Sequence, residues 1–207
     1  MAEHHADEPR ERLSRPAFDV VALAASAGGL KALAEILGAL PADFPAAVVV
    51  VQHLDPRHQS LMAEILGRRV AMSVRQARAG DRLEPGSVFI APPNHHLIVE
   101  GDGTLSLSQA ELVHFVRPSA DLLFESVAGS YGDRAIAVVL TGTGSDGGTG
   151  VRAIKARGGT VIAQDESSSD FFGMPQAAIQ TGCVDFVLPL VEIAGALLVL
   201  MKSGEPS

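Results

Sequence analysis

Short runs of almost purely apolar residues are the feature of this sequence that most restricts its fold. The clearest are AAVVVVQ at 46–52 and AIAVVL at 135–140, and both have the length of a strand. A strand that is apolar on both faces must be covered on both faces, as in the middle of a parallel sheet. Helix-like segments separate these runs, as in βαβ units. The pattern predicts an α/β protein with a doubly wound, mostly parallel sheet and helices on both faces, a Rossmann-like three-layer sandwich.

The expected elements form one domain over residues 17–202. A charged lead-in over 1–16, poor in apolar residues, is expected to be disordered, and 203–207 form a tail. Strands are expected at 19–25, 46–52, 135–140 and 160–164, and helices at 28–40, 59–69, 119–131 and about 189–201. Ser119 is a candidate N-cap for its helix. Alternating segments over 73–108, with a Gly101-Asp102-Gly103 turn, indicate a β-rich insertion or sheet edge.

Charge and composition exclude several functional classes. The chain has 207 residues and a formal net charge of −8, without a basic stripe, so nucleic-acid binding is not expected. One cysteine excludes an internal disulfide, and no Cys/His pattern indicates a metal site. The apolar runs are too short to span a bilayer, and the polar N-terminus lacks the apolar core of a secretory signal. A cytoplasmic protein without membrane insertion is expected.

Three reactive side chains follow three of the predicted strands. Ser26 comes after the first strand, His53 after the second, and Asp146 after the strand at 135–140. The carboxyl ends of parallel strands share one edge of the sheet, where ligands bind in open α/β folds. The three groups are therefore expected to meet there as a nucleophile, a base and an orienting acid.

Acyl transfer needs these residue types. A serine hydroxyl requires a base within hydrogen-bond reach, histidine can take and return the proton, and a carboxylate fixes the imidazole tautomer. Ser26 also precedes a predicted helix, where free backbone N–H groups favour a developing oxyanion. Each residue has an ordinary structural alternative as well: a helix cap for Ser26, a structural histidine for His53 and a turn residue for Asp146.

A second motif favours a different function. Residues 142–147 match G-x-G-x-x-G between a predicted strand and a predicted helix, and Asp165 and Glu166 lie where a ribose-binding acid is expected. This pattern indicates a dinucleotide-binding protein. Asp146 argues against that interpretation, because it would place a carboxylate inside a pyrophosphate cradle. The dinucleotide alternative also leaves Ser26 and His53 without a function.

The chain resembles the catalytic domain of the chemotaxis protein-glutamate methylesterase (CheB) family from about residue 20 to 201. Matching segments, in the family's order and spacing, are ASAGG at 25–29, VVVQHL at 49–54, FIAPPNHH at 89–96, RPSADLLFESVA at 117–128, LTGTGSDGGTG at 140–150 and IAQDESSSDFFGMPQAAI at 162–179. The resemblance implies the same doubly wound fold and carries the family's triad onto Ser26, His53 and Asp146.

Further site residues follow from this resemblance. Thr143 matches the position whose backbone N–H helps bind the oxyanion, and the N–H of Ala27 is a second candidate donor. Arg117 corresponds to a residue at the rim of the site, with an implied role in substrate binding. The chain has Ala24 where the family usually has glycine, and Ala27 where threonine is frequent. Both differences affect the turn that carries the serine and leave the triad intact.

The implied activity is hydrolysis of glutamate γ-methyl esters on the cytoplasmic helices of chemotaxis receptors, with release of methanol and without a cofactor or metal. Deamidation of receptor glutamine can follow the same path. Typical family members begin with a phosphorylatable receiver domain, whereas only a short polar segment precedes the catalytic domain here. We therefore expect a stand-alone esterase domain or a piece of a longer protein, controlled by a separate regulatory protein. A non-catalytic receptor-binding module and a dinucleotide-binding protein remain alternatives.

Overall fold

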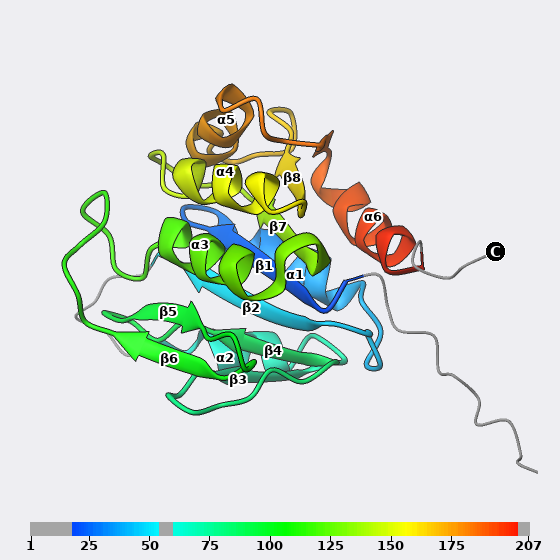
Figure 1. The fold of residues 1–207 in the computed structure, drawn as a ribbon. Helices are drawn as coiled ribbons and strands as arrows, with labels where there is room; N and C mark the ends of the chain where they lie inside the picture. Colours follow the sequence, from blue (N-terminus) through cyan, green and yellow to red (C-terminus); the bar gives the residue numbers. More distant parts are fainter. Residues whose placement is uncertain (1–17, 54–59, 203–207) are drawn as a thin grey trace, which may run out of the picture.

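The fold is built on one sheet of seven parallel strands (Figure 1). The computed structural model describes residues 18–53 and 60–202. The order across the sheet is β3-β4-β2-β1-β7-β8-β9. The strands are β1 (Val20–Ala25), β2 (Ala47–Gln52), β3 (Ser73–Gln76), β4 (Ser87–Ile90), β7 (Ala135–Val139), β8 (Thr160–Gln164) and β9 (Phe186–Leu188).

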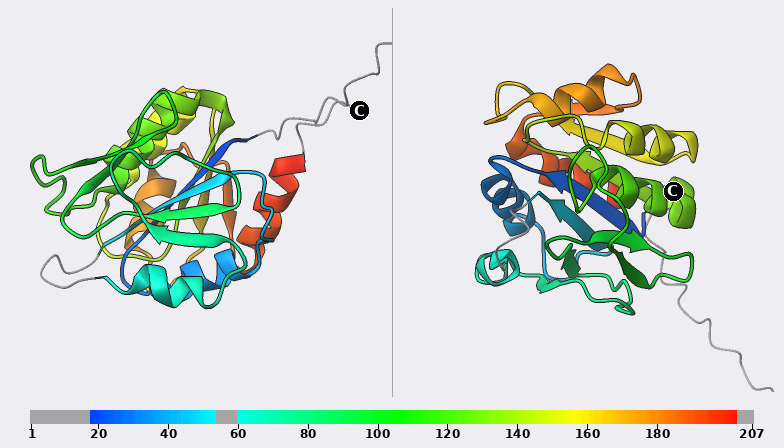
Figure 2. Two further views of the ribbon diagram at one scale, coloured as in Figure 1. Left: turned by 90° about the horizontal axis from the view of Figure 1, so that it is seen from below. Right: turned by 90° about the vertical axis from the view of Figure 1, so that its left-hand side faces the viewer.

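Helices cover both faces of this sheet, as the right-hand view of Figure 2 shows for α1 and α2 on one side and α3 and α4 on the other. The helices are α1 (Gly29–Gly38), α2 (Met62–Gly67), α3 (Ala120–Tyr131), the 3₁₀ turn η1 (Gly132–Arg134), α4 (Gly148–Ala156), α5 (Gly173–Gln180) and α6 (Leu190–Lys202). Residues of α1, α2 and α6 share one apolar core with the sheet, and residues of α3, α4 and α5 share the other. The predicted three-layer α/β architecture is confirmed.

The apolar runs are buried because alternate side chains enter opposite cores. In β1, Val21 and Leu23 pack in the core beneath α1 and α6, whereas Val20 and Ala22 pack in the core beneath α3 and α4. All four side chains are fully buried. The period-two geometry of a strand therefore requires an apolar residue at every position of β1, which explains the absence of polar alternation in its sequence.

The chain reverses its direction of strand addition at β1. From β1 it proceeds to β2 on one side, and later returns to place β7 on the other side. The carboxyl ends of β1, β2 and β7 therefore lie side by side at a switch point, where open α/β sheets bind ligands. The loops that follow these three strands carry Ser26, His53 and Asp146.

The β-rich stretch over 73–108 divides between two sheets. Strands β3 and β4 form one edge of the main parallel sheet, and β5 (His96–Val99) pairs antiparallel with β6 (Leu105–Ser108) in a separate hairpin. β4 is buried throughout, as a covered parallel strand requires, whereas β6 is buried only at its first residue. The hairpin packs against α3, where Ser126 Oγ accepts a hydrogen bond from Val99 N at 3.1 Å.

Element boundaries differ from the predicted ones by a few residues. The helix expected over 28–40 ends at Gly38, and the helix expected over 59–69 is described from Met62 to Gly67. Position 59, the lead-in over 1–16 and the tail over 203–207 lie outside the described residues. Among the helices in 18–53 and 60–202, none has the length and hydropathy needed to cross a membrane.

Candidate active site

Ser26 lies in a tightly bonded turn between β1 and α1. Its backbone N–H donates to Thr141 O at 3.0 Å, and its carbonyl accepts from Gly29 N at 2.9 Å and from Gln52 Nε2 at 2.6 Å. The N-cap of α1 is Gly28, in the left-handed conformation. Ser26 therefore does not occupy the N-cap position of this helix, and the capping alternative is wrong.

His53 follows β2 and is placed directly beside the serine turn. Its backbone N–H donates to Ala25 O at 3.1 Å, and its carbonyl accepts from Gln52 Nε2 at 3.1 Å. One amide group of Gln52 thus binds the backbone of both Ser26 and His53. Sequence reasoning did not select Gln52, although a polar residue at the end of an apolar strand was a visible signal. Its 5% exposure shows that it is part of the interior.

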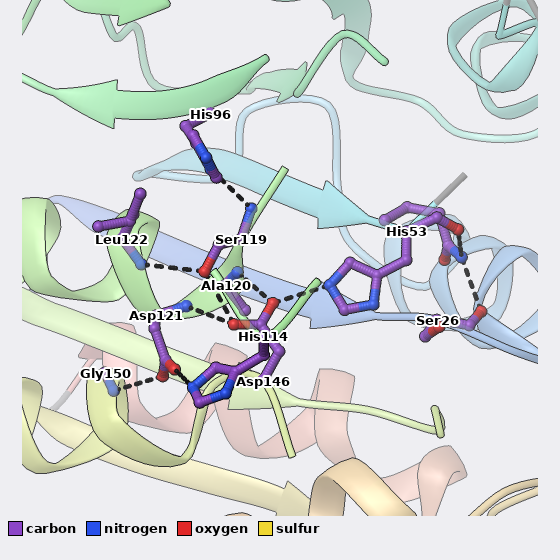
Figure 3. A network of polar contacts seen from close by, with 11 residues as sticks. Ser26, His53, His96, His114, Ser119, Ala120, Asp121, Leu122, Asp146 and Gly150 are labelled. Atoms are coloured by element: carbon purple, nitrogen blue, oxygen red, sulfur yellow. Dashed lines mark hydrogen bonds and ion pairs between the residues drawn. The ribbon is translucent and has the colours of Figure 1, made fainter. Parts of the chain in front are cut away.

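The imidazole of His53 is bonded to the carboxylate of Asp146. Nε2 of His53 lies 2.8 Å from Oδ2 of Asp146, and the two side chains are 13% and 3% exposed. Figure 3 shows the His53 ring between Asp146 and Ser26, with its second ring nitrogen on the side of Ser26. Because Asp146 accepts a hydrogen from Nε2, Nδ1 keeps a lone pair that can take the serine proton.

Asp146 is held by the N-terminus of α3. Oδ2 of Asp146 accepts from Ala120 N at 2.6 Å, and Oδ1 accepts from Ser119 Oγ at 2.8 Å and from Asp121 N at 3.2 Å. Ser119 is the N-cap of α3, as predicted, and its Oγ also accepts from Leu122 N at 3.5 Å. The first backbone N–H groups of a helix and its dipole favour an anion at this place. The carboxylate therefore has a fixed orientation toward His53.

These contacts determine the ionisation of Asp146. Burial acts to raise the pKa of Asp146, but the hydrogen bonds from His53, Ala120 N and Ser119, together with the charge of His53, hold this pKa below its usual value. Hydrogen bonds to the charged form of a carboxyl group favour that form. Asp146 is therefore ionised at neutral pH and can stabilise an imidazolium ion on His53.

The two predicted oxyanion donors lie in the loops beside the nucleophile. Gly142 packs so closely that a Cβ there would stand 2.8 Å from Ser26 Cβ and 2.4 Å from Met174 Sδ. Thr143 follows Gly142 and is exposed. Within the described residues, the backbone N–H groups of Thr143 and Ala27 donate no hydrogen bond. Both are available to an oxyanion, and their role in binding one remains a prediction.

The glycine-rich loop at 142–147 serves this site. Close packing explains Gly142, and the carboxylate of Asp146 faces α3 and His53. Asp165, considered above as a ribose ligand, accepts hydrogen bonds from Ser167 and Ser168 instead. The motif is thereby accounted for without a dinucleotide.

Comparison with known proteins identifies the family of this fold and site. A family model described as CheB methylesterase matches residues 21–197. The chain belongs to the CheB methylesterase family. The crystal structure of the Thermotoga maritima CheB methylesterase catalytic domain superposes with a TM-score of 0.85 and 37% identity, over 88% of this chain and 98% of that domain.

Two curated relatives show how this CheB domain compares in length. A protein-glutamate methylesterase/protein-glutamine glutaminase of Moorella thermoacetica is 44% identical over 92% of this chain but only 46% of its own length. A putative protein of the same name from Leptospira interrogans is 39% identical over 86% of this chain and 92% of its own length. The chain spans about half the length of several such relatives.

The guanidinium of Arg117, predicted at the substrate-binding rim, forms hydrogen bonds with other residues of the domain. Nε and Nη2 donate to Asn94 Oδ1 at 3.0 and 2.6 Å, and Nη1 donates to the carbonyls of Gln109 and Ala110 at 2.9 and 2.6 Å. The guanidinium thus ties the loop over 109–117 to the segment before β5. Its role in substrate binding remains a prediction, whereas its role in holding this loop is observed.

Proposed function

We propose that this chain is a serine esterase that hydrolyses the γ-methyl esters of glutamate residues in proteins, the activity named for its relatives. The 2.8 Å contact between His53 Nε2 and Asp146 Oδ2, with the ring beside Ser26, carries this proposal. Such an arrangement activates a serine for attack on an ester carbonyl. The family and the relatives named protein-glutamate methylesterase support the choice of ester.

In the first half of the reaction, Ser26 Oγ attacks the ester carbonyl while Nδ1 of His53 takes the hydroxyl proton. The carbonyl oxygen becomes an oxyanion, and the N–H groups of Thr143 and Ala27 are the proposed donors to it. The C–O bond to the methoxy group then breaks. His53 returns its proton to that oxygen, methanol leaves, and the glutamyl group remains bound to Ser26 as an ester.

In the second half, water replaces the alcohol. His53 takes a proton from water, the resulting hydroxide equivalent attacks the acyl carbonyl, and a second oxyanion forms at the same place. The bond to Ser26 Oγ breaks, His53 returns the proton to the serine, and the glutamic acid side chain is released and loses the second water proton to solvent as a carboxylate. Asp146 stays ionised throughout and stabilises the imidazolium in both halves.

Glutamine deamidation follows the same path with ammonia as the leaving group. The double name of the relatives, methylesterase and glutaminase, favours this second reaction. We propose the cytoplasmic helices of chemotaxis receptors as the substrate for both reactions, since the family is that of a chemotaxis methylesterase. Control by a separate regulatory protein remains a prediction.

The decisive experiment measures methanol release from a methylated receptor fragment. The wild-type chain is compared with Ser26→Ala and with Ser106→Ala, a serine on β6 whose hydroxyl bonds Glu100 outside the site. We expect release by wild type and Ser106→Ala only. Removing a triad member typically lowers kcat by about 10⁴- to 10⁶-fold.

The other outcomes are equally informative. Release by Ser26→Ala at the wild-type rate would exclude Ser26 as the nucleophile. No release by any of the three proteins would favour the non-catalytic receptor-binding module. Binding of NAD or NADP in a parallel titration would support the dinucleotide alternative instead.

A further inference from the structure

A second buried carboxylate lies next to the triad and has no part in the reaction described above. Asp121 stands in the first turn of α3 and is 3% exposed. Its backbone N–H donates to Asp146 Oδ1 at 3.2 Å, and its Oδ1 accepts from Gly150 N at 2.7 Å. Its Oδ2 lies 3.1 Å from Nε2 of His114, a half-exposed residue of the loop before α3. Figure 3 shows this chain of contacts from His114 to His53.

The two carboxylates cap each other's helices. Asp146, in the loop that leads into α4, accepts N–H groups from the start of α3. Asp121, on α3, accepts an N–H group from the start of α4. Each helix thus supplies donors to an acid carried by the other, so neither helix start can move without breaking a charge-assisted hydrogen bond.

Close packing of α4 against α3 reinforces the hydrogen bonds between the two helix starts. A Cβ at Gly150 would lie 3.0 Å from Asp121 Cα and 2.6 Å from Phe124 Cβ, so only glycine permits α4 to approach α3 in this way. The loop that carries Asp146 is therefore clamped between two helix starts in direct contact. Loss of these contacts would displace Asp146 relative to His53, because His53 is bonded separately to β1 through its backbone N–H.

We propose that Asp121 is a positioning residue for the esterase: by joining the starts of α3 and α4, it holds Asp146 against His53. Only the expected change in esterase rate rests on the proposed function. The placement of Asp146 by Asp121 is a property of the folded protein and does not depend on that function. Asp121 touches no reacting atom and acts through Asp146. The function of a positioning residue is lost when the geometry shifts, and a displacement of about 1 Å costs roughly 100-fold in rate.

The surroundings of Asp121 act on its pKa in opposite directions, and the net effect raises it. Burial and the nearby negative charge of Asp146 raise the pKa of Asp121, while the Gly150 N–H and the charge of His114 act in the opposite direction. Glu125, the next acid along α3, is exposed, and partial burial together with the negative charge of Asp121 raises the pKa of its carboxyl group. An ionised Asp121 therefore adds negative potential beside Asp146.

Substitutions at Asp121 can separate the hydrogen bond it accepts from Gly150 N–H from the effect of its negative charge. Asp121→Ala removes both, Asp121→Asn keeps an amide oxygen that can accept from Gly150 N–H, and Glu125→Gln removes a neighbouring exposed charge from the same helix. We expect Asp121→Ala to lower kcat for methanol release by about 10- to 100-fold with KM within about twofold. Asp121→Asn restores kcat to within about threefold, and Glu125→Gln matches the wild type.

Two readouts distinguish positioning from simple loss of stability. In Asp121→Ala, kcat falls without a matching rise in KM, the split expected when the catalytic geometry changes and substrate binding does not. The proton NMR signal of the His53 Nε2–H group, bonded to Asp146, shifts or broadens in Asp121→Ala and stays in place in Glu125→Gln. Asp121→Val, which has no acceptor for the Gly150 N–H, is a second cap-deficient variant if the alanine variant does not fold.

The NMR signal also separates this proposal from the proposed function. It is recorded on folded protein without substrate, so it reports the placement of Asp146 even if no ester is hydrolysed. A folded cap-deficient variant with an unchanged His53 signal overturns the positioning role, as does one with wild-type kcat. A changed signal in a chain that hydrolyses no ester supports the clamp and rejects the esterase.

Discussion

Nε2 of His53 lies 2.8 Å from Oδ2 of Asp146, although 93 positions separate the two residues in the sequence. The strands that precede them, β2 and β7, flank β1 on opposite sides. Both side chains consequently extend from the same edge of the sheet, with Ser26 at the end of the strand between them. The sheet thus places the three predicted triad residues across its switch point.

Asp146→Asn should abolish most of the activity without preventing folding. An asparagine cannot stabilise an imidazolium ion and does not select the tautomer of His53 that the reaction needs, so kcat should fall by about 10⁴-fold. Steady-state methanol release measures the effect. Asp165→Asn is the matched control, because within residues 18–53 and 60–202 the Asp165 carboxylate bonds only the hydroxyls of Ser167 and Ser168 and the Ser168 N–H. Comparable losses in both variants would contradict the assignment of Asp146.

Gly142→Ala should damage both stability and activity. The added Cβ would meet Met174 Sδ at 2.4 Å and Ser26 Cβ at 2.8 Å, so the nucleophile turn must move. Overpacking of this kind typically costs about 1–3 kcal/mol. Gly129→Ala, at an open position on α3, should instead stabilise the fold by about 0.5–1 kcal/mol. Urea unfolding and kcat of both variants provide the check, and equal kcat values would show that Gly142 does not constrain Ser26.

The pH dependence of stability should differ in sign between the two buried acids. Asp146 has a folded pKa below its unfolded value of about 3.9, so its carboxylate stabilises the fold above that pH. This contribution is lost as the pH falls through the folded pKa. Asp121 has a raised folded pKa, so its contribution is complete below about pH 4 and is lost as the pH rises through the folded pKa.

Calorimetric Tm values measured between about pH 3 and pH 7 test the opposite pH dependence expected for Asp146 and Asp121. The destabilisation caused by Asp146→Asn should be larger at neutral than at acidic pH. The Tm of Asp121→Asn, relative to wild type, should rise from acidic to neutral pH. If the Tm differences of the two variants from wild type changed in the same direction with pH, the two carboxylates would not contribute to stability with opposite pH dependence.

Arg117→Ala should release the loop over 109–117. The side chain donates to Asn94 and to two carbonyls of that loop, and its removal leaves these acceptors without their donor. Limited proteolysis should cut the loop about tenfold faster in the variant, with a small change in global unfolding, because cleavage follows local opening. Arg134→Ala, outside this loop, is the control. Unchanged proteolysis with a raised KM would instead support the predicted role of Arg117 in substrate binding.

The sequence by itself determined the α/β class and predicted that Ser26, His53 and Asp146 lie at one edge of the sheet. Runs such as AAVVVVQ can be satisfied only by burial on both faces, and the direction of parallel strands places the residues that follow them at one edge. These inferences hold because they depend on local periodicity and on strand polarity. The resemblance to the family then placed Thr143, Ala27 and Arg117, whose predicted roles in the reaction rest on that resemblance.

Only the tertiary structure decided what surrounds the triad. Ser119 was predicted to cap its own helix, and the fold also directs its hydroxyl to Asp146. Asp121 carries no local signal for its role, and the polar end of β2 does not reveal what Gln52 binds, because Gly150 and Ser26 lie on other segments of the chain. Likewise, the stretch over 73–108 was predicted as one β-rich insertion or sheet edge, yet β4 joins the main sheet and β6 a hairpin. Long-range packing and hydrogen bonding select among locally equivalent options, and these interactions exist only once the helices and strands have come together.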